Sequence, residues 1–215
     1  MQVAVKMRLR RVAVWLARVL VGGTFIVSGW AKSVDPWGFI IKVNEYLQVW
    51  NLSFPREVVL TACVSLACVE FCTGVLLATG SLKRTGAWLA AAMMAFMLPL
   101  TAYIAIANPV SDCGCFGDFL VLSNIATFVK NLIISVLVVY LICVGHTVRG
   151  FYAAPIQWLV VTVSLAFPMF LSIVGYHFQP IVDFRPYKLG SDIYAEAEAG
   201  ADNTLYIYVK NGEQR

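Results

Sequence analysis

The chain has 215 residues and a net charge of +4; 60% of its residues are hydrophobic and only 13% are charged. Soluble domains contain about 45–50% apolar and about 25% charged residues, so the composition excludes a soluble globular domain, a disordered chain, a secreted disulfide knot and a nucleic-acid-binding protein. Because about 20 apolar residues cross a bilayer, the length allows four or five transmembrane helices and a small tail.

Five apolar segments follow one another along the chain. Each is near the length that crosses a bilayer, and none shows the alternation of a barrel strand. The first is longer than the apolar core of a signal peptide and carries Arg18, so we expect it to be retained. The sequence therefore predicts an all-α membrane protein with spans at residues 12–31, 58–79, 86–107, 124–144 and 156–178.

Basic residues predict the orientation of these spans. The leader at 1–11 is basic, and the two other short loops with Lys or Arg each follow an even number of spans. Since such loops remain in the cytoplasm, we expect a cytoplasmic N-terminus in a bacterial inner membrane. The 32–56 connection, the 111–123 loop, which has no Lys or Arg, and the tail are then extracytoplasmic. The basic positions are Lys6, Arg8, Arg10, Arg11, Lys83, Arg84 and Arg149.

The first extracytoplasmic connection contains a predicted short helix. Asp35-Pro36 suits a helix start, since proline is tolerated in the first turn. Apolar residues then recur at helical spacing, at Phe39, Ile40, Val43 and Tyr46. We expect an amphipathic helix that lies on the outer membrane face.

The tail is polar and ends in an alternating stretch, 204–210, before Asn211-Gly212, which favours a hairpin turn. A hairpin needs a second strand, whereas the printed sequence stops at Arg215, so we expect a fragment or a vestigial, truncated β domain. The predicted organisation is a leader at 1–11, a four-helix membrane domain at 12–146, a fifth transmembrane helix at 155–178 and the tail at 179–215.

Two cysteines stand one residue apart in the loop that we expect on the oxidising side of the membrane. Cys113 and Cys115 can approach bonding distance only in a tightly bent backbone, and Gly114 and Gly117 supply the freedom for that bend. A disulfide across so small a loop is strained and readily reduced, and it gains little as a structural bridge. The pattern predicts a redox-active pair.

Two other interpretations of this pair are open. The thiols can be inert or merely bridged, or they can bind a metal with His177, Asp112 and Asp118. The spacing is not that of a zinc finger, which favours the redox hypothesis. The flanking carboxylates disfavour a thiolate, whereas Lys130, inside the fourth span, can extend toward the loop and favour one.

The remaining cysteines lie within the spans, at Cys63, Cys68, Cys72 and Cys143. Buried cysteine packs as a small hydrophobe, and we expect this role for them, Cys143 included. Cys68 and Cys72 share one helix face, so a second thiol pair that relays electrons is the alternative. Such a pair in one straight helix is poorly placed for a disulfide.

Glu70 lies near the middle of the second span, where a carboxylate is costly and indicates a function. Arg18 in the first span falls at a similar depth at about 1.5 Å per residue. We therefore expect a buried Arg18–Glu70 ion pair that sets the helix register, with a proton relay or a quinone contact at Glu70 as the alternative. Lys32 ends the first span, where its side chain can extend to the interface.

Two sets of residues resemble those of known membrane proteins. The first resembles the DoxX-like proteins and consists of FIVSGWAK at 25–32, Asp35-Pro36, Tyr46, Glu70 and Gly74. The second resembles the MauE (methylamine utilisation) branch and consists of CGCFG at 113–117 and Lys130-Asn131. The resemblance covers roughly residues 10–146 and implies a four-helix membrane bundle, which the fifth span and the tail exceed.

MauE is implicated in forming or transporting disulfides for methylamine dehydrogenase maturation, beside a thioredoxin-like partner. The resemblance implies that Cys113 and Cys115 are the redox pair and that Glu70, Lys32 and Lys130 are polar positions of the site. We expect electron exchange with a thioredoxin-like extracytoplasmic protein through a mixed disulfide, with a membrane quinone as the candidate acceptor. The alternatives are a non-catalytic assembly or scaffold subunit with a structural loop disulfide, and a small transporter, which the unbroken spans disfavour.

Overall fold

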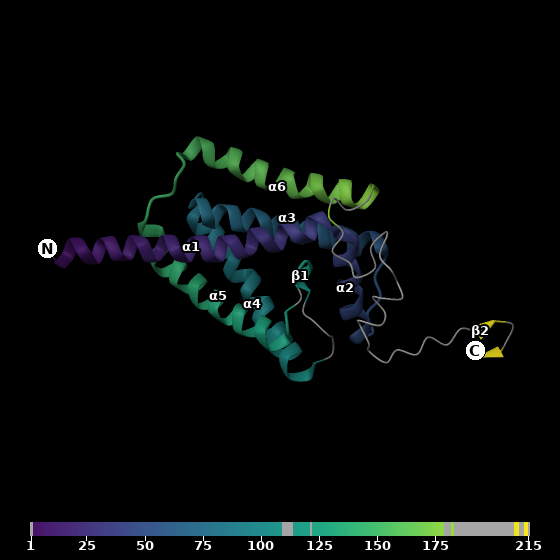
Figure 1. Ribbon diagram of the computed structural model, residues 1–215. Helices are drawn as coiled ribbons and strands as arrows, with labels where there is room; N and C mark the ends of the chain where they lie inside the picture. Colours follow the sequence, from purple (N-terminus) through teal and green to yellow (C-terminus); the bar gives the residue numbers. More distant parts are fainter. Residues whose placement is uncertain are drawn as a thin grey trace. The chain divides into compact units, whose positions relative to one another are not determined.

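The computed structural model describes residues 2–108, 114–120, 122–178 and 182, and the backbone of 209–210 and 213–214. The chain forms two units, Met1–Phe184 and Arg185–Arg215. The described helices of the first unit are α1 (Gln2–Val34), α2 (Pro36–Val49), α3 (Arg56–Thr79), α4 (Lys83–Ala107), α5 (Asn124–Val144), the 3₁₀ turn η1 (Gly145–Thr147) and α6 (Ala154–His177). An extended segment, β1 (Cys115–Asp118), precedes α5 (Figure 1).

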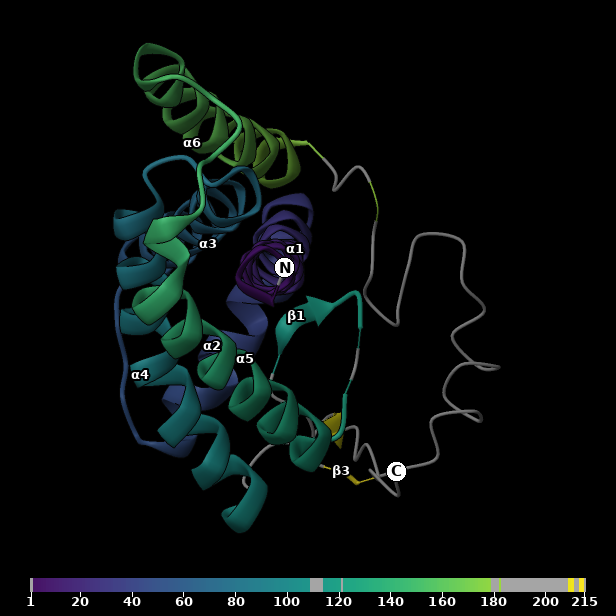
Figure 2. The same ribbon diagram turned by 90° about the vertical axis from the view of Figure 1, so that its left-hand side faces the viewer.

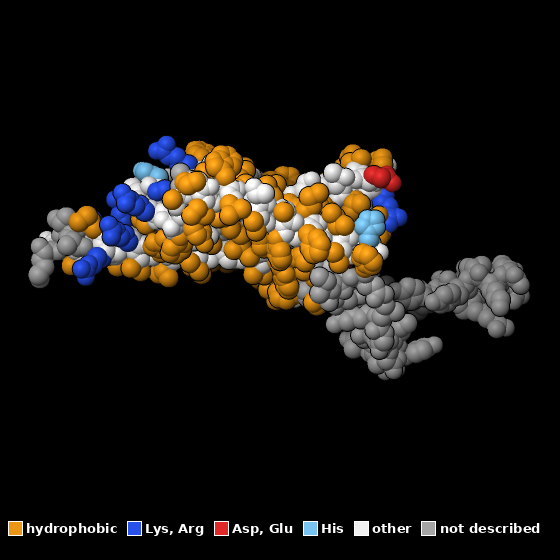
Figure 3. Space-filling model, turned by 90° about the horizontal axis from the view of Figure 1, so that it is seen from above, with side chains coloured by type: hydrophobic (Ala, Val, Ile, Leu, Met, Phe, Trp, Pro, Cys, Tyr) orange, Lys and Arg blue, Asp and Glu red, His pale blue; other side chains and the backbone are white. Residues whose placement is uncertain are grey.

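Five of these helices are long and apolar enough to cross a membrane, which confirms the predicted all-α membrane fold. They are Val5–Val34, Arg56–Thr79, Lys83–Ala107, Asn124–Thr147 and Pro155–His177. Apolar side chains cover most of the face in Figure 3, as expected of a surface that contacts lipid tails. The chain is a multi-pass membrane protein. The first helix is longer than its predicted span, because α1 also includes the basic residues before it.

The helices α1 and α3 pack closely along each other, and α6 lies against both, while α4 and α5 form a second pair (Figures 1 and 2). The close approach depends on glycine. A Cβ on Gly29 would lie 2.7 Å from the carbonyl oxygen of Ala67, and one on Gly74 would lie 2.7 Å from that of Gly22. Small residues of this kind let transmembrane backbones approach, and here they determine the register of α1 against α3.

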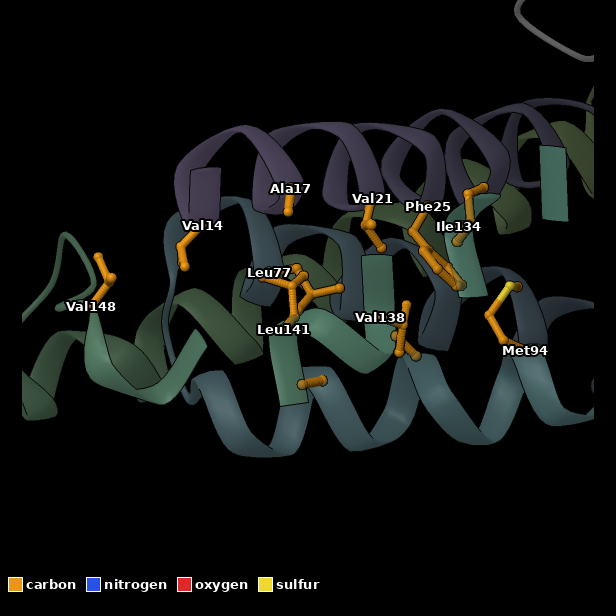
Figure 4. Packing of buried hydrophobic residues seen from close by; sticks show 12 residues of the cluster. Val14, Ala17, Val21, Phe25, Leu77, Met94, Ile134, Val138, Leu141 and Val148 are labelled. Carbon is orange, nitrogen blue, oxygen red and sulfur yellow. The ribbon is translucent and has the colours of Figure 1, made fainter. Parts of the chain in front are cut away.

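An apolar cluster fills the space between the helices of the bundle. In Figure 4, side chains from α1, among them Val21 and Phe25, point toward Met94 of α4 and Val138 of α5. Because lipid tails are as apolar as these side chains, close packing stabilises the bundle more than removal from water does.

The helix α2 confirms the predicted short helix between the first two spans. The side chain of Asp35 accepts a hydrogen bond from the backbone N–H of Gly38 at 3.0 Å, and Pro36 occupies the first turn, a standard helix start. Its buried face presents Phe39 and Ile40 to α3. Its position on the outer membrane face stays a prediction.

In the second unit the predicted hairpin is present. The strand β2 (Val209–Lys210) pairs in antiparallel fashion with β3 (Glu213–Gln214), on either side of Asn211-Gly212. The strand after Asn211-Gly212 is only two residues long, and the expected fragment or truncated β domain stays a prediction. The rest of the predicted tail, except residue 182, lies outside the described residues.

Candidate functional site

The structure brings four of the predicted site residues together in the first unit. Lys32 at the end of α1, Glu70 in the middle of α3, Cys115 at the start of β1 and Lys130 in α5 line one cavity. Gly114 precedes Cys115 beside α2, and Gly117 is described by its backbone within β1. Cys113 lies outside the described residues, so the predicted approach of the two sulfur atoms stays a prediction.

Lys32 and Glu70 form a buried ion pair. The Nζ atom of Lys32 donates to both carboxylate oxygens, at 2.7 Å to Oε1 and 2.6 Å to Oε2, and the two side chains are only 1% and 5% exposed. A third hydrogen bond runs from Nζ to the Ser28 hydroxyl at 3.1 Å. All three ammonium protons therefore have acceptors, as a charge held inside a membrane protein requires.

The predicted Arg18–Glu70 pair is wrong, because the depth argument ignored the register of the helices. Gly29 packs against Ala67 of α3, and this contact places the next turn of α1, with Lys32, beside Glu70. Arg18 lies about four turns before Lys32, toward the other end of the bundle. Its guanidinium donates instead to carbonyl groups that follow α5, at 2.8 Å and 3.1 Å.

Ser28 connects the ion pair to the cysteine loop. Its Oγ lies 2.8 Å from Oε2 of Glu70 and 2.7 Å from the carbonyl oxygen of Cys115. A hydroxyl has a single proton, so at any moment Ser28 donates to either the carboxylate or the carbonyl while it accepts from Lys32. The loop carbonyl of Cys115 and the carboxylate of Glu70 thus compete for the single hydroxyl proton of Ser28.

The cysteine loop packs between the helices, with part of it buried. The segment β1 packs against α1 and α2 (Figure 2), and Phe116 is buried with the Nζ atom of Lys130 4.2 Å from its ring centroid. Gly114 has a φ of +63°, a left-handed conformation that favours glycine. A Cβ there would lie 3.3 Å from Cβ of Lys42 on α2.

Two cavities share Lys32 and Cys115 as lining residues. The smaller, of about 30 Å³, is lined by the ion pair, Ser28 and Lys130, and has room for a water molecule. The larger, of about 170 Å³, has a mostly apolar lining that includes the aromatic side chains of α2 and Phe96 of α4. A small compartment that contains the buried charges and a larger apolar compartment therefore adjoin the same cysteine.

The other cysteines fit the packing interpretation in part. Cys63 and Cys72 are buried, and Cys72 accepts a hydrogen bond from Ser164 of α6 at 3.3 Å, while Cys68 forms no disulfide. Cys143 is exposed on α5, so the expectation that it packs inside the bundle is wrong: its side of α5 faces outward. Among the described residues no three His, Cys, Asp or Glu side chains gather as a metal site would require, and Asp112 lies outside those residues.

Sequence reasoning missed Ser28 and Phe116 as members of the site. Ser28 precedes Lys32 by four residues, so the two share one face of α1, and this spacing was the available signal. Phe116 carried no such signal, because its contact with Lys130 depends on how the loop folds back.

Comparison with known proteins places these observations in a family. The chain matches the family described as methylamine utilisation protein MauE over residues 10–144, more than half of its length. It is 26% identical over 127 residues to Protein TlpB of Flavobacterium psychrophilum, a match that covers 58% of this chain and 35% of that protein. No solved structure matches the chain significantly. With five apolar helices and a match across the first four, the chain belongs to the MauE family of membrane proteins.

Proposed function

We propose that this protein is a membrane thiol–disulfide redox protein in which Cys113 and Cys115 exchange electrons with a thioredoxin-like extracytoplasmic partner. The observation that supports the proposal most is the hydrogen bond between Ser28 and the Cys115 carbonyl, because it connects the Cys-Gly-Cys loop to a buried ion pair. A charged pair inside the membrane is costly and indicates a function. Membership of the MauE family is consistent with this role.

The proposed exchange follows ordinary thiol–disulfide chemistry. A thiolate of the reduced partner attacks one sulfur of the Cys113–Cys115 disulfide, forms a mixed disulfide and releases the other sulfur as a thiolate, which takes up a proton. The second partner thiol, once deprotonated, attacks the mixed disulfide and releases the remaining cysteine. The partner loses two electrons and two protons, and the pair gains them; the reverse sequence reduces the partner.

The buried residues hold the loop for this exchange. When Ser28 donates to the carbonyl of Cys115 it anchors the loop, and Lys32 donates to the Ser28 hydroxyl at the same time. Lys130, above the ring of Phe116, adds positive charge next to the loop, and positive charge favours the thiolate that exchange requires. These are positioning and electrostatic roles, whereas the sulfur atoms carry the reaction.

The larger cavity has the chemistry that a quinone ring requires. Its lining is apolar and rich in aromatic side chains, and it borders Cys115. We propose Phe39, Trp50 and Phe96 as the side chains that would hold such a ring. A bound quinone would supply an acceptor for the two electrons and two protons of the dithiol.

Thiol trapping in cells tests the proposal. Membranes are quenched with acid and the thiols are labelled with an alkylating mass tag after oxidising or reducing growth. The 113–115 pair is expected to change its oxidation state with the growth condition, and Cys113→Ser or Cys115→Ser to trap a mixed disulfide with the partner. Cys143→Ser, at an exposed position outside the site, is the matched control and is expected to behave as the parent protein.

Two results would contradict the redox role. A pair that stays oxidised under all conditions would favour the assembly or scaffold subunit with a structural disulfide. Normal oxidation of the partner in cells that carry the Cys113→Ser, Cys115→Ser double variant would exclude the exchange. Identification of the trapped protein also shows whether methylamine metabolism, the process in the family's description, is the context of this member.

A further inference from the structure

One end of the bundle carries a surplus of positive charge. The connection from α3 to α4 there meets the segment between α5 and α6, since Phe151 donates a backbone hydrogen bond to Thr79 at 3.0 Å. Lys83, Arg84 and Arg149 line a common cavity at this junction. Figure 3 shows most of the visible Lys and Arg side chains at one end of the apolar surface.

Among the side chains that the structure describes in the first unit, no carboxylate balances this charge. Asp35 and Glu45 follow the far end of α1, and Glu57 begins α3, which runs antiparallel to α1, so all three lie toward the opposite end. Glu70 is already paired with Lys32 in the buried ion pair described above.

Two of the cations are held by neutral groups. The Nη2 atom of Arg18 donates to the carbonyl oxygens of Gly145 and Val148 at 2.8 Å and 3.1 Å. The Nζ atom of Lys83 donates to those of His146 and Val148 at 3.0 Å and 2.9 Å. Carbonyl dipoles satisfy hydrogen-bond donors but carry no net charge, so both positive charges stay uncompensated.

The cavity at this junction measures about 500 Å³, within the range of about 300–1,000 Å³ of ligand sites. The first turn of the 25-residue helix α4 borders it, and the amide groups of such a turn lack intrahelical acceptors and attract anions. The polar residues of its lining are Lys83, Arg84, Thr85, His146, Arg149 and Gln157.

Exposed aromatic side chains place the cavity at the depth of lipid headgroups. Trp88 and Trp158 are 64% and 67% exposed, and each lies less than two turns from the start of its helix, which begins beside the cavity. Tryptophan is enriched where a membrane protein crosses the interface between lipid tails and water. An anion drawn from the headgroup layer is therefore available at this position.

We infer that this cavity binds the phosphodiester headgroup of an anionic phospholipid. Arg84 and Arg149 provide the charge that pairs with the phosphate, and the first turn of α4 provides amide donors. Basic pockets between transmembrane helices are the kind of site that anionic headgroups occupy. The lipid neutralises the cluster and ties the start of α4 to the segment between α5 and α6, because Arg84 belongs to the first and Arg149 to the second.

Native mass spectrometry of the purified full chain tests this inference, with phosphatidylglycerol and phosphatidylcholine as the probes. Phosphatidylglycerol is expected to bind at least about tenfold more tightly than phosphatidylcholine. The double variant Arg84→Gln, Arg149→Gln is expected to lose this preference. Its matched control, Arg8→Gln, Arg10→Gln, removes two exposed charges from the same end outside the cavity and is expected to keep it.

Several outcomes would overturn the inference. An equal loss in both double variants would show a diffuse surface charge, and binding of inorganic phosphate as tight as that of phosphatidylglycerol would show a site for free anions. Arg84→Lys, Arg149→Lys preserves charge and is expected to retain the preference. Its failure to do so, with the helical circular dichroism of the parent, would also count against a headgroup site built on charge.

Discussion

Loss of one partner of the Lys32–Glu70 pair is expected to destabilise the protein more than loss of both. Glu70→Leu removes the acceptors of two of the three hydrogen bonds that the Lys32 ammonium group donates, and leaves this group, which is 1% exposed, with the Ser28 hydroxyl. Lys32→Met leaves a carboxylate that is 5% exposed. Each single variant is expected to lose about 3–5 kcal/mol of unfolding free energy, whereas the double variant stays within about 1 kcal/mol of the parent.

The assay is denaturant unfolding of the purified chain in detergent, followed by circular dichroism and analysed as a double-mutant cycle. The i,i+3 pair Lys42–Glu45 on α2 is the matched control, since its Nζ–Oε2 distance is 3.4 Å and its side chains are 14% and 41% exposed. A cycle on this pair is expected to give a coupling energy below about 1 kcal/mol.

Additive single-variant effects in the Lys32–Glu70 cycle would refute the reasoning, because independent losses mean that neither charge depends on the other. Thiol exchange with the partner gives a separate readout. It is expected to fall in the double variant as well, since Ser28 then loses the ammonium donor of Lys32 that orients its hydroxyl next to Cys115.

Three further predictions concern the neighbours of this pair. Ser28→Ala is expected to cost about 1–3 kcal/mol in the same unfolding assay and to slow thiol exchange at Cys115; an unchanged rate would contradict the anchoring role. Gly74→Ala is expected to lower the unfolding free energy by about 1–3 kcal/mol, because its Cβ would meet backbone atoms of α1 at less than 3 Å. Gly23→Ala, with open space around its Cβ, is the control and is expected to be neutral or stabilising. Equal losses of unfolding free energy in the two variants would contradict the role of the close contact at Gly74. Leu66→Trp, which fills the larger cavity, is expected to slow reoxidation of the dithiol by added quinone while exchange with the partner continues. An unaltered reoxidation rate would exclude this cavity as the quinone site.

Much of the fold was predictable because its determinants are local. The length and hydropathy of each span, the Asp35-Pro36 helix start and the pairing of β2 with β3 depend on neighbouring residues. Four residues of spacing also place Ser28 and Lys32 on one face of α1, although their shared role was not recognised. The cysteine loop stood out for its composition, independently of any fold.

The sequence by itself determined that this chain spans a membrane with apolar helices and carries a Cys-Gly-Cys loop between two of them. Only the tertiary structure decided that Glu70 pairs with Lys32 and that Arg18 holds the end of α5. The reason is that depth along a helix is a local quantity, whereas the register between two helices depends on which small residues meet. Where Gly29 meets Ala67, Lys32 lies beside Glu70, and Ser28 connects this pair to the loop carbonyl of Cys115.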